Sequence, residues 1–298
     1  MGDLGLYVTG TERFKIIEEI DRGNQSIVYL VEEYETKRKY AAKVCSESYQ
    51  KEIEQKLTIR EIDILSKLKH PAVVRMRGFS LSNFDLKPFP VIFTVYKQNG
   101  SLRKILDREK KEKIEGWNNT KKQIVVLGIA SALEYMHNLT IMHRNITPMN
   151  ILLDKHFYPY ISGFHLSKKY DPKNPNGQTL FRGKRGYIAP EVLAEASYDW
   201  RVDIYAYAMV IHEILTGEVP FNNSGNSTAL TFSSKLSEPY LSLIKNCSNP
   251  DPSQRPSFSK IVELLCTDES YYLPDIDINE YARYKYKVLT YGKNIKLQ

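Results

Sequence analysis

The stretch that most constrains this chain is His143–Leu153, which reads HRNITPMNILL. A histidine, an arginine and an asparagine open it, and an apolar run closes it. The preceding segment Lys121–His137 carries a wide apolar stripe at helical spacing, which predicts a core helix that leads into the stretch. Thirteen residues beyond Asn150 the chain reads GFH at Gly163–His165. This polar loop after a buried helix is therefore the first place to look for a functional site.

Composition and charge narrow the class of protein. The chain has 298 residues, of which 42% are hydrophobic and 26% charged, as expected for one large soluble domain. The net charge of +7 is spread along the chain, without a Lys/Arg-dense arm or interleaved aromatic residues, so we do not expect nucleic-acid binding. The three cysteines lack metal-site or CxxC spacing and are interpreted as reduced thiols.

Membrane association is not expected either. No charged-then-apolar leader opens the chain. The longest apolar run, Ile124–Leu133, is far too short to span a bilayer. The sequence therefore predicts a cytoplasmic protein without membrane insertion.

The first third of the chain has the periodicity of strands. Phe14–Glu33 alternates apolar and polar residues and predicts two strands around a turn at Asp21–Gln25. Tyr40–Val44 and Val91–Tyr96 read as further strands. Between them, the segment around Glu61 has apolar residues on one face and ends at a His-Pro pair, which predicts a helix.

The rest of the chain is mainly helical in pattern. Two helices are expected within residues 101–138 and another over Asp203–Leu215. Leu166–Gly186 is polar and rich in turn residues, and we expect a mobile loop there. The tyrosine-rich tail after Cys266 is either an amphipathic docking helix or a disordered end, and the sequence leaves both open.

Taken in order, several stretches resemble the motifs of protein kinases. YAAKV at Tyr40–Val44 resembles the V-A-I-K strand, and His143–Leu153 resembles the H-R-D-x-x-x-x-N loop. YIAPE at Tyr187–Glu191 resembles the A-P-E motif, and DPSQRP at Asp251–Pro256 the late D-P-x-x-R-P motif. The resemblance runs from about Phe14 to Leu265, and the phrases HEILTGEVPF and RPSFSKIVELL are similar to the tyrosine-kinase-like branch.

The resemblance implies an α+β, two-lobed protein-kinase-like fold. A small, mostly antiparallel β N-lobe with one main helix is expected over residues 14–97, and a larger, mostly α-helical C-lobe over 98–267. Residues 1–13 would be a lead-in and 268–298 a separate tyrosine-rich tail.

The resemblance also assigns roles to individual residues. Lys43 would pair with Glu61 and hold nucleotide phosphates, while Asp203 would cap the catalytic loop and Glu191 would form a salt bridge with Arg255. Arg144 would be a further structural residue. In active relatives, the arginine at this position contacts a phosphate group that is carried on the loop after the metal-binding triplet. The implied nucleotide-binding positions are Gly23, Val28, Ala41, Lys43, Thr94, Tyr96, Asn150 and Leu152.

Two positions that carry the chemistry depart from the family pattern. Asn145 stands where the loop has its catalytic aspartate, and an amide cannot accept the substrate's proton. Gly163 stands where the metal-binding aspartate is due and has no ligand atom. Thr147 replaces a lysine that contacts phosphate in most serine/threonine members. Asn150 alone would be a vestigial metal ligand, so we expect weak or absent ATP binding and no Mg²⁺ site.

Two functions of different classes follow from these departures. The first is a pseudokinase, a scaffold or allosteric module whose expected partners are other signalling proteins, with an active kinase as one candidate. The second is a weak or unorthodox Ser/Thr or Tyr kinase that uses Lys43 and Asn150. A subsidiary hypothesis makes Thr179, in the basic loop, a phosphorylation site read by Arg144. The alternative is a solvated basic loop or a docking patch for an acidic partner.

Overall fold

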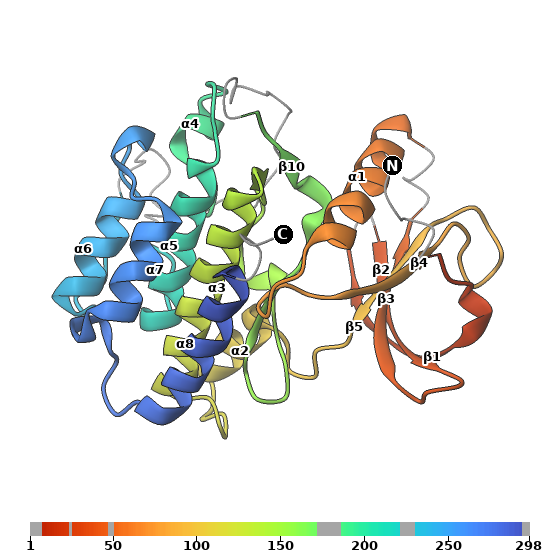
Figure 1. Ribbon diagram of the computed structural model, residues 1–298, viewed down its shortest axis with the longest axis horizontal. Helices are drawn as coiled ribbons and strands as arrows, with labels where there is room; N and C mark the ends of the chain where they lie inside the picture. Colours follow the sequence, from red (N-terminus) through yellow and green to blue (C-terminus); the bar gives the residue numbers. More distant parts are fainter. Residues whose placement is uncertain (1–7, 24–25, 47–50, 172–185, 221–229, 294–298) are drawn as a thin grey trace. The chain divides into compact units, whose positions relative to one another are not determined.

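A computed structural model describes residues 8–23, 26–46, 51–171, 186–220 and 230–293. The chain divides into two compact units (Figure 1). The first comprises Met1–Lys69 and Val74–Gln98, and the second His70–Val73 and Asn99–Gln298. His70–Val73 thus belongs to the second unit although its neighbours on both sides belong to the first, which the sequence did not indicate. No helix in the described ranges has the length and apolar character needed to cross a membrane.

The first unit is an antiparallel five-stranded sheet with one long helix. The strands pair in the order β1-β2-β3-β5-β4. The strands predicted within Phe14–Glu33, at Tyr40–Val44 and at Val91–Tyr96 are confirmed, with β5 ending one residue earlier than expected, whereas β4 was not predicted. The elements are β1 (Phe14–Arg22), β2 (Ser26–Glu33), β3 (Lys39–Cys45), α1 (Glu52–Lys67), β4 (Met76–Ser80) and β5 (Val91–Val95).

One face of this sheet is closed by a hydrophobic cluster. Phe14 stacks on Phe93 with ring centroids 4.3 Å apart, and Tyr40 meets Phe14 edge-on. Side chains alternate between the two faces along a strand, so Ala41 and Lys43 point to the face opposite Tyr40. The cluster consists of Phe14, Val31, Tyr40, Ala42, Val44, Val91 and Phe93.

The second unit is mainly helical, as the resemblance implies. Its central helix α3 is buried over most of its length, and α5, α7 and α8 pack against it (Figure 1). Asn118 caps the N-terminus of α3 by accepting a hydrogen bond from the amide of Lys121. The helices are α2 (Leu102–Glu109), α3 (Asn119–Asn138), α4 (Pro190–Leu193), α5 (Arg201–Thr216), α6 (Glu238–Cys247), α7 (Phe258–Thr267) and α8 (Ile278–Lys293).

Short strands hold the loops of the second unit in place. One small sheet has the order β6-β8-β9, and β10 pairs with β7. The strand β10 lies inside Leu166–Gly186, so the expectation of a loop throughout that segment is wrong at its start, where Lys168 pairs with Met142. Residues 172–185, and Thr179 with them, lie outside the described residues. The strands are β6 (Gly100–Ser101), β7 (Ile141–Met142), β8 (Ile151–Leu153), β9 (Pro159–Ile161) and β10 (Lys168–Lys169).

The described part of the tyrosine-rich tail contains a helix, which favours the first of the two alternatives left by the sequence. It forms α8, whose residues Tyr281, Tyr284 and Val288 are buried. These positions recur at helical spacing and make one apolar face. The described part of the tail therefore packs within the second unit.

Candidate functional site

The first unit contributes an ion pair between β3 and α1. Lys43 Nζ lies 2.7 Å from Glu61 Oε2 and 3.0 Å from Oε1, so the contact predicted from the sequence is present. The Glu61 side chain is almost fully buried, whereas Lys43 is 28% exposed. The ion pair therefore joins a buried carboxylate to a lysine whose side chain is partly exposed.

Other predicted nucleotide-binding positions share a face of the sheet with Lys43. Val28 lies opposite Lys43, and Thr94 lies opposite Ala41 in the strand register. These four side chains are half-buried, in contrast to the hydrophobic cluster on the other face. Tyr96, beyond the end of β5, is also half-buried. The sheet therefore presents a small apolar surface beside one cation.

Neither the backbone conformation nor the space at position 23 requires a glycine. Gly23 has no positive φ, and the nearest atom to a Cβ built there is 3.8 Å away. Its amide donates to the Ser26 carbonyl at 2.9 Å. Nothing in the conformation of Gly23 itself marks this turn as a phosphate-binding loop.

In the second unit, one carboxylate organises the loop that begins at His143. The Asp203 carboxylate, at the start of α5, accepts hydrogen bonds from the amides of His143 (2.8 Å) and Arg144 (2.7 Å). His137 Nε2 lies 3.0 Å from the same carboxylate. Burial alone would raise the pKa of Asp203, but the contact with His137 and the amide donors outweigh burial and hold it below its usual value. Asp203 therefore stays charged and caps the loop.

This cap stabilises a strained backbone. Arg144 has φ +63°, a left-handed conformation that is uncommon for residues with a side chain. Its guanidinium is buried: Nε donates to the Leu166 carbonyl at 2.7 Å, and Nη1 donates to the Tyr198 hydroxyl at 3.0 Å. Arg144 thus ties the loop to the segment after Gly163. The hypothesis that Arg144 reads a phosphate on Thr179 stays a prediction.

The ring of His143 fixes the geometry on the other side of the loop. Its Nε2–H donates to the Ser162 carbonyl at 2.9 Å, and its Nδ1 accepts from the Asn145 amide at 3.2 Å. Phe164 packs edge-on against the ring with centroids 5.0 Å apart. These contacts hold residues 143–145 and 162–164 together in a fixed arrangement.

The amide of Asn150 occupies the space over Gly163. Gly163 has φ +77°, and a Cβ built on it would lie only 2.4 Å from Asn150 Oδ1 and 2.5 Å from Cγ. Real Cβ atoms do not approach other heavy atoms so closely, so any larger residue here would force Asn150 to move. Asn150 is itself tethered, because its Nδ2 donates to the Asn145 carbonyl at 2.8 Å. The two departures from the family pattern are therefore connected through Asn150.

These residues do not fit a Mg²⁺ ion. Gly163 supplies no oxygen ligand, so the amide oxygen of Asn150, whose nitrogen donates to the Asn145 carbonyl, is the one side-chain ligand atom that these two positions offer. Among the described residues, no group of three or more His, Cys, Asp or Glu side chains could hold a metal ion. Mg²⁺ prefers several oxygen ligands in octahedral geometry, usually with one or two carboxylates. At Asn145 and Gly163 the arrangement offers an amide that can orient a hydroxyl, but no carboxylate.

A second ion pair anchors the end of the Tyr187–Glu191 segment. Arg255 binds Glu191 through two parallel contacts of 2.7 and 2.8 Å, and its side chain is fully buried. The same guanidinium donates to the carbonyls of Asn249 and Arg201 and lies over the Tyr205 ring. The pair predicted from the sequence is present. Its burial and bidentate geometry make it a structural anchor.

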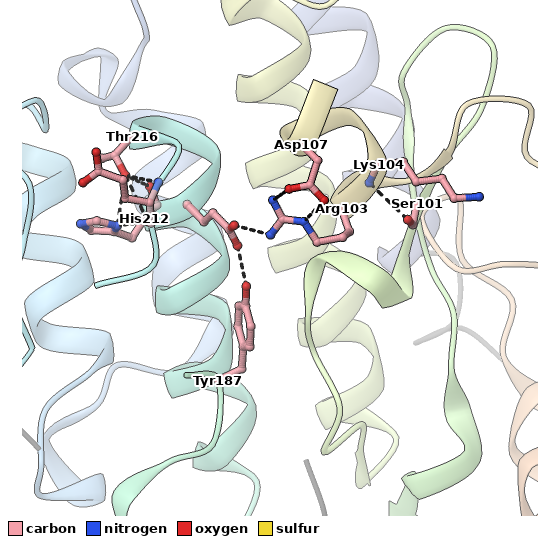
Figure 2. Close-up of polar contacts among 9 residues, drawn as sticks. Ser101, Arg103, Lys104, Asp107, Tyr187, His212 and Thr216 are labelled. Atoms are coloured by element: carbon pink, nitrogen blue, oxygen red, sulfur yellow. Dashed lines mark hydrogen bonds and ion pairs between the residues drawn. The ribbon is translucent and has the colours of Figure 1, made fainter. Parts of the chain in front are cut away.

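The sequence did not reveal a buried network that reaches the same segment. Arg103 on α2 binds Asp107 at 2.6 Å and also donates to Glu213 on α5. The Tyr187 hydroxyl donates to the other oxygen of Glu213 at 2.5 Å, and Figure 2 shows Tyr187 and Arg103 converging on α5. Burial, together with the Glu213 charge, raises the pKa of the Tyr187 phenol. The one available signal was a glutamate inside the apolar helix Asp203–Leu215.

Comparisons with known proteins show that this chain is similar in sequence to several protein kinases. The chain is 33% identical over 210 residues to a probable serine/threonine-protein kinase of Dictyostelium discoideum, covering 68% of this chain and 20% of that protein. It is 35% identical over 222 residues to serine/threonine-protein kinase VIK of Arabidopsis thaliana, covering 69% and 49%. Myosin light chain kinase A of Dictyostelium discoideum is 34% identical over 217 residues, with 70% and 68% covered.

The first two of these relatives are much longer than the region they share with this chain, which spans about a fifth and about half of them. The profile of the protein kinase domain matches residues 14–265, which include the Lys43–Glu61 pair, the His143–Leu153 loop and the Glu191–Arg255 pair. On that match and these relatives, the chain belongs to the protein kinase domain family.

Proposed function

We propose that this kinase domain is a pseudokinase, which acts as a signalling scaffold or allosteric binding module and binds nucleotide weakly or not at all. The observation that carries the proposal is the Asn150 amide, which fills the space over Gly163 where a metal-binding side chain would stand. Position 163 thus lacks a metal-binding side chain, and the Asn150 amide fills the space that such a side chain would need.

The residues at positions 145 and 163 are expected to lower the rate of phosphotransfer by more than the retained residues could restore. Loss of a general base at Asn145 costs about 10²- to 10⁴-fold in rate. Loss of a metal that stabilises developing charge costs several kcal/mol more, with roughly 1.4 kcal/mol for each factor of ten. Lys43 remains as a cation for phosphate, but it cannot replace either function. The two losses are not strictly additive, although both act in the same direction.

The retained contacts support a folded module that binds other proteins. The Asp203 cap and the buried Glu191–Arg255 pair maintain the loop and the segment around it. We infer that the partners are other signalling proteins, an active kinase among them, and that the chain belongs to the tyrosine-kinase-like branch. Both inferences rest on the family resemblance of the sequence and on the intact framework.

A second candidate is a weak or unorthodox ATP-dependent protein kinase. The intact Lys43–Glu61 pair favours it, because that pair holds nucleotide phosphates in active members of the family. The names of two relatives, both serine/threonine-protein kinases, favour it too.

A phosphotransfer assay separates the two candidates. The chain would be incubated with labelled ATP and either Mg²⁺ or Mn²⁺, with autophosphorylation and a generic protein substrate as readouts. Lys43→Ala is the background control, and an Asn145→Asp/Gly163→Asp double variant asks whether restoring both carboxylates is sufficient. The pseudokinase proposal expects the parent to match Lys43→Ala with both metals. Incorporation by the parent well above that background, with either metal, would establish the second candidate.

A further inference from the structure

The last described helix, α8, lies beyond the family match, which ends at residue 265. It runs along α3 in the second unit (Figure 1). Its buried residues Tyr281, Tyr284 and Val288 form the face toward the rest of this unit. Three large buried side chains on a single helix bury enough apolar surface for stable docking.

Close contact between α8 and α3 depends on a glycine. A Cβ at Gly128 would lie 2.4 Å from the Tyr284 hydroxyl and 2.5 Å from Pro159 Cγ. Gly128 sits inside an α-helix, where glycine is less favourable than alanine by about 1 kcal/mol. The absence of a side chain at Gly128 is therefore explained by the space that Tyr284 occupies.

Polar contacts fix the start and middle of α8. The Glu280 carboxylate accepts from the Tyr158 hydroxyl at 3.0 Å and pairs with Lys121 on α3. The Tyr281 hydroxyl donates to the Leu265 carbonyl at 2.8 Å. Because these contacts come from separate parts of the second unit, the register of α8 on α3 is fixed.

The other end of α8 reaches the segment His70–Val73. The Tyr291 ring meets the buried His70 ring edge-on, with centroids 6.1 Å apart. His70 also stacks on Tyr135 of α3 at 5.2 Å, and its Nδ1 accepts from the Ala72 amide at 3.1 Å. The Ala72 carbonyl in turn accepts from Ile161 at 2.8 Å. The segment is thus held between α3, β9 and the end of α8.

We propose that α8 is a strap that fixes His70–Val73, and that releasing it is a built-in way to loosen the chain directly after α1. Only two residues, Leu68 and Lys69, separate the end of α1 from His70. The segment follows α1 directly in the chain, and α1 carries Glu61, the partner of Lys43, so we expect a looser segment to weaken the last turn of α1. This inference does not depend on whether the domain catalyses phosphotransfer.

Hydrogen exchange on the full chain tests the strap. Tyr291→Ala removes the contact with His70, and Tyr286→Ala is the matched control, because Tyr286 is 72% exposed on the same helix. Gly128→Ala is a second variant, which displaces Tyr284 and also presses on Pro159 at the start of β9, while His70 and Tyr291 keep their own side chains. An aromatic pair contributes roughly a three- to tenfold change in an opening equilibrium.

We expect Tyr291→Ala to speed exchange at the amides of Ala72 and Val73 by about three- to tenfold, with a smaller rise in the last turn of α1. Gly128→Ala is expected to do the same and to expose α8 itself, while Tyr286→Ala leaves exchange unchanged. The proposal is overturned if α8 loses protection in Gly128→Ala while residues 70–73 keep theirs. It is equally overturned if Tyr291→Ala matches the Tyr286→Ala control.

Discussion

Replacing Gly163 by alanine is the sharpest perturbation that the structure offers. A left-handed backbone at a residue with a side chain costs about 1–2 kcal/mol. The new Cβ would also displace the Asn150 amide and break its hydrogen bond to the Asn145 carbonyl, which contributes about 0.5–1.5 kcal/mol. The sum is roughly 1.5–3.5 kcal/mol, or a fall in melting temperature of roughly 3–14 °C for a domain of this size.

Thermal unfolding of purified variants measures this effect, and the chain provides its own control. Gly23→Ala is expected to melt with the parent, since Gly23 has no positive φ and a Cβ there would make an ordinary van der Waals contact, 3.8 Å from the Ser26 carbonyl oxygen. In an Asn150→Ala background, Gly163→Ala should cost only the backbone strain of about 1–2 kcal/mol. If Gly163→Ala melts within a degree of Gly23→Ala, the account of this site is wrong.

The remaining predictions concern the framework around the site. Arg255→Ala leaves a buried Glu191 carboxylate unpaired and should lower the free energy of unfolding by about 3–5 kcal/mol. The control Arg108→Ala removes a partner from an exposed pair and should cost under about 0.5 kcal/mol. Equal melting temperatures of the two variants would show that the buried pair contributes nothing. Tyr187→Phe removes a hydrogen bond to a buried carboxylate and should destabilise by about 1.5–3 kcal/mol in denaturant titrations; an unchanged midpoint would contradict the network in Figure 2. Because the pKa of Asp203 is lowered on folding, its stabilisation is present above the unfolded value of about 3.9 and is lost as pH falls toward the folded value. Asp203→Asn should therefore be less stable than the parent at neutral pH and approach it in acid, and a constant difference from neutral to acid pH would count against this role.

Much of the fold could be predicted because its signals are local. Alternation over Phe14–Glu33 and the apolar stripe of Lys121–His137 are set by which face each residue buries, and the structure has strands and a helix there. Lys43–Glu61 and Glu191–Arg255 could be predicted as pairs only through the resemblance, since no local pattern joins residues so far apart. The structure contains both contacts.

What the sequence could not predict depends on packing between distant segments. Nothing in the sequence indicates that the Asn150 amide fills the space over Gly163, because that depends on how β8 and β9 bring the two residues together. The tail was left undecided between helix and disorder for a similar reason. Packing of its apolar face stabilises the helix α8, and that packing requires the space that Gly128 leaves for Tyr284.

Nucleotide binding with and without metal tests the central claim most directly. A ligand at 100 times its dissociation constant stabilises a protein by about 2.7 kcal/mol, which is roughly 5 °C or more here. With millimolar ATP we predict a shift in melting temperature well below that, equal in Mg²⁺ and in EDTA, and reduced further by Lys43→Ala. A large shift that requires Mg²⁺ would contradict the account, because it would mean that Asn150 moves aside and a working metal site forms over Gly163.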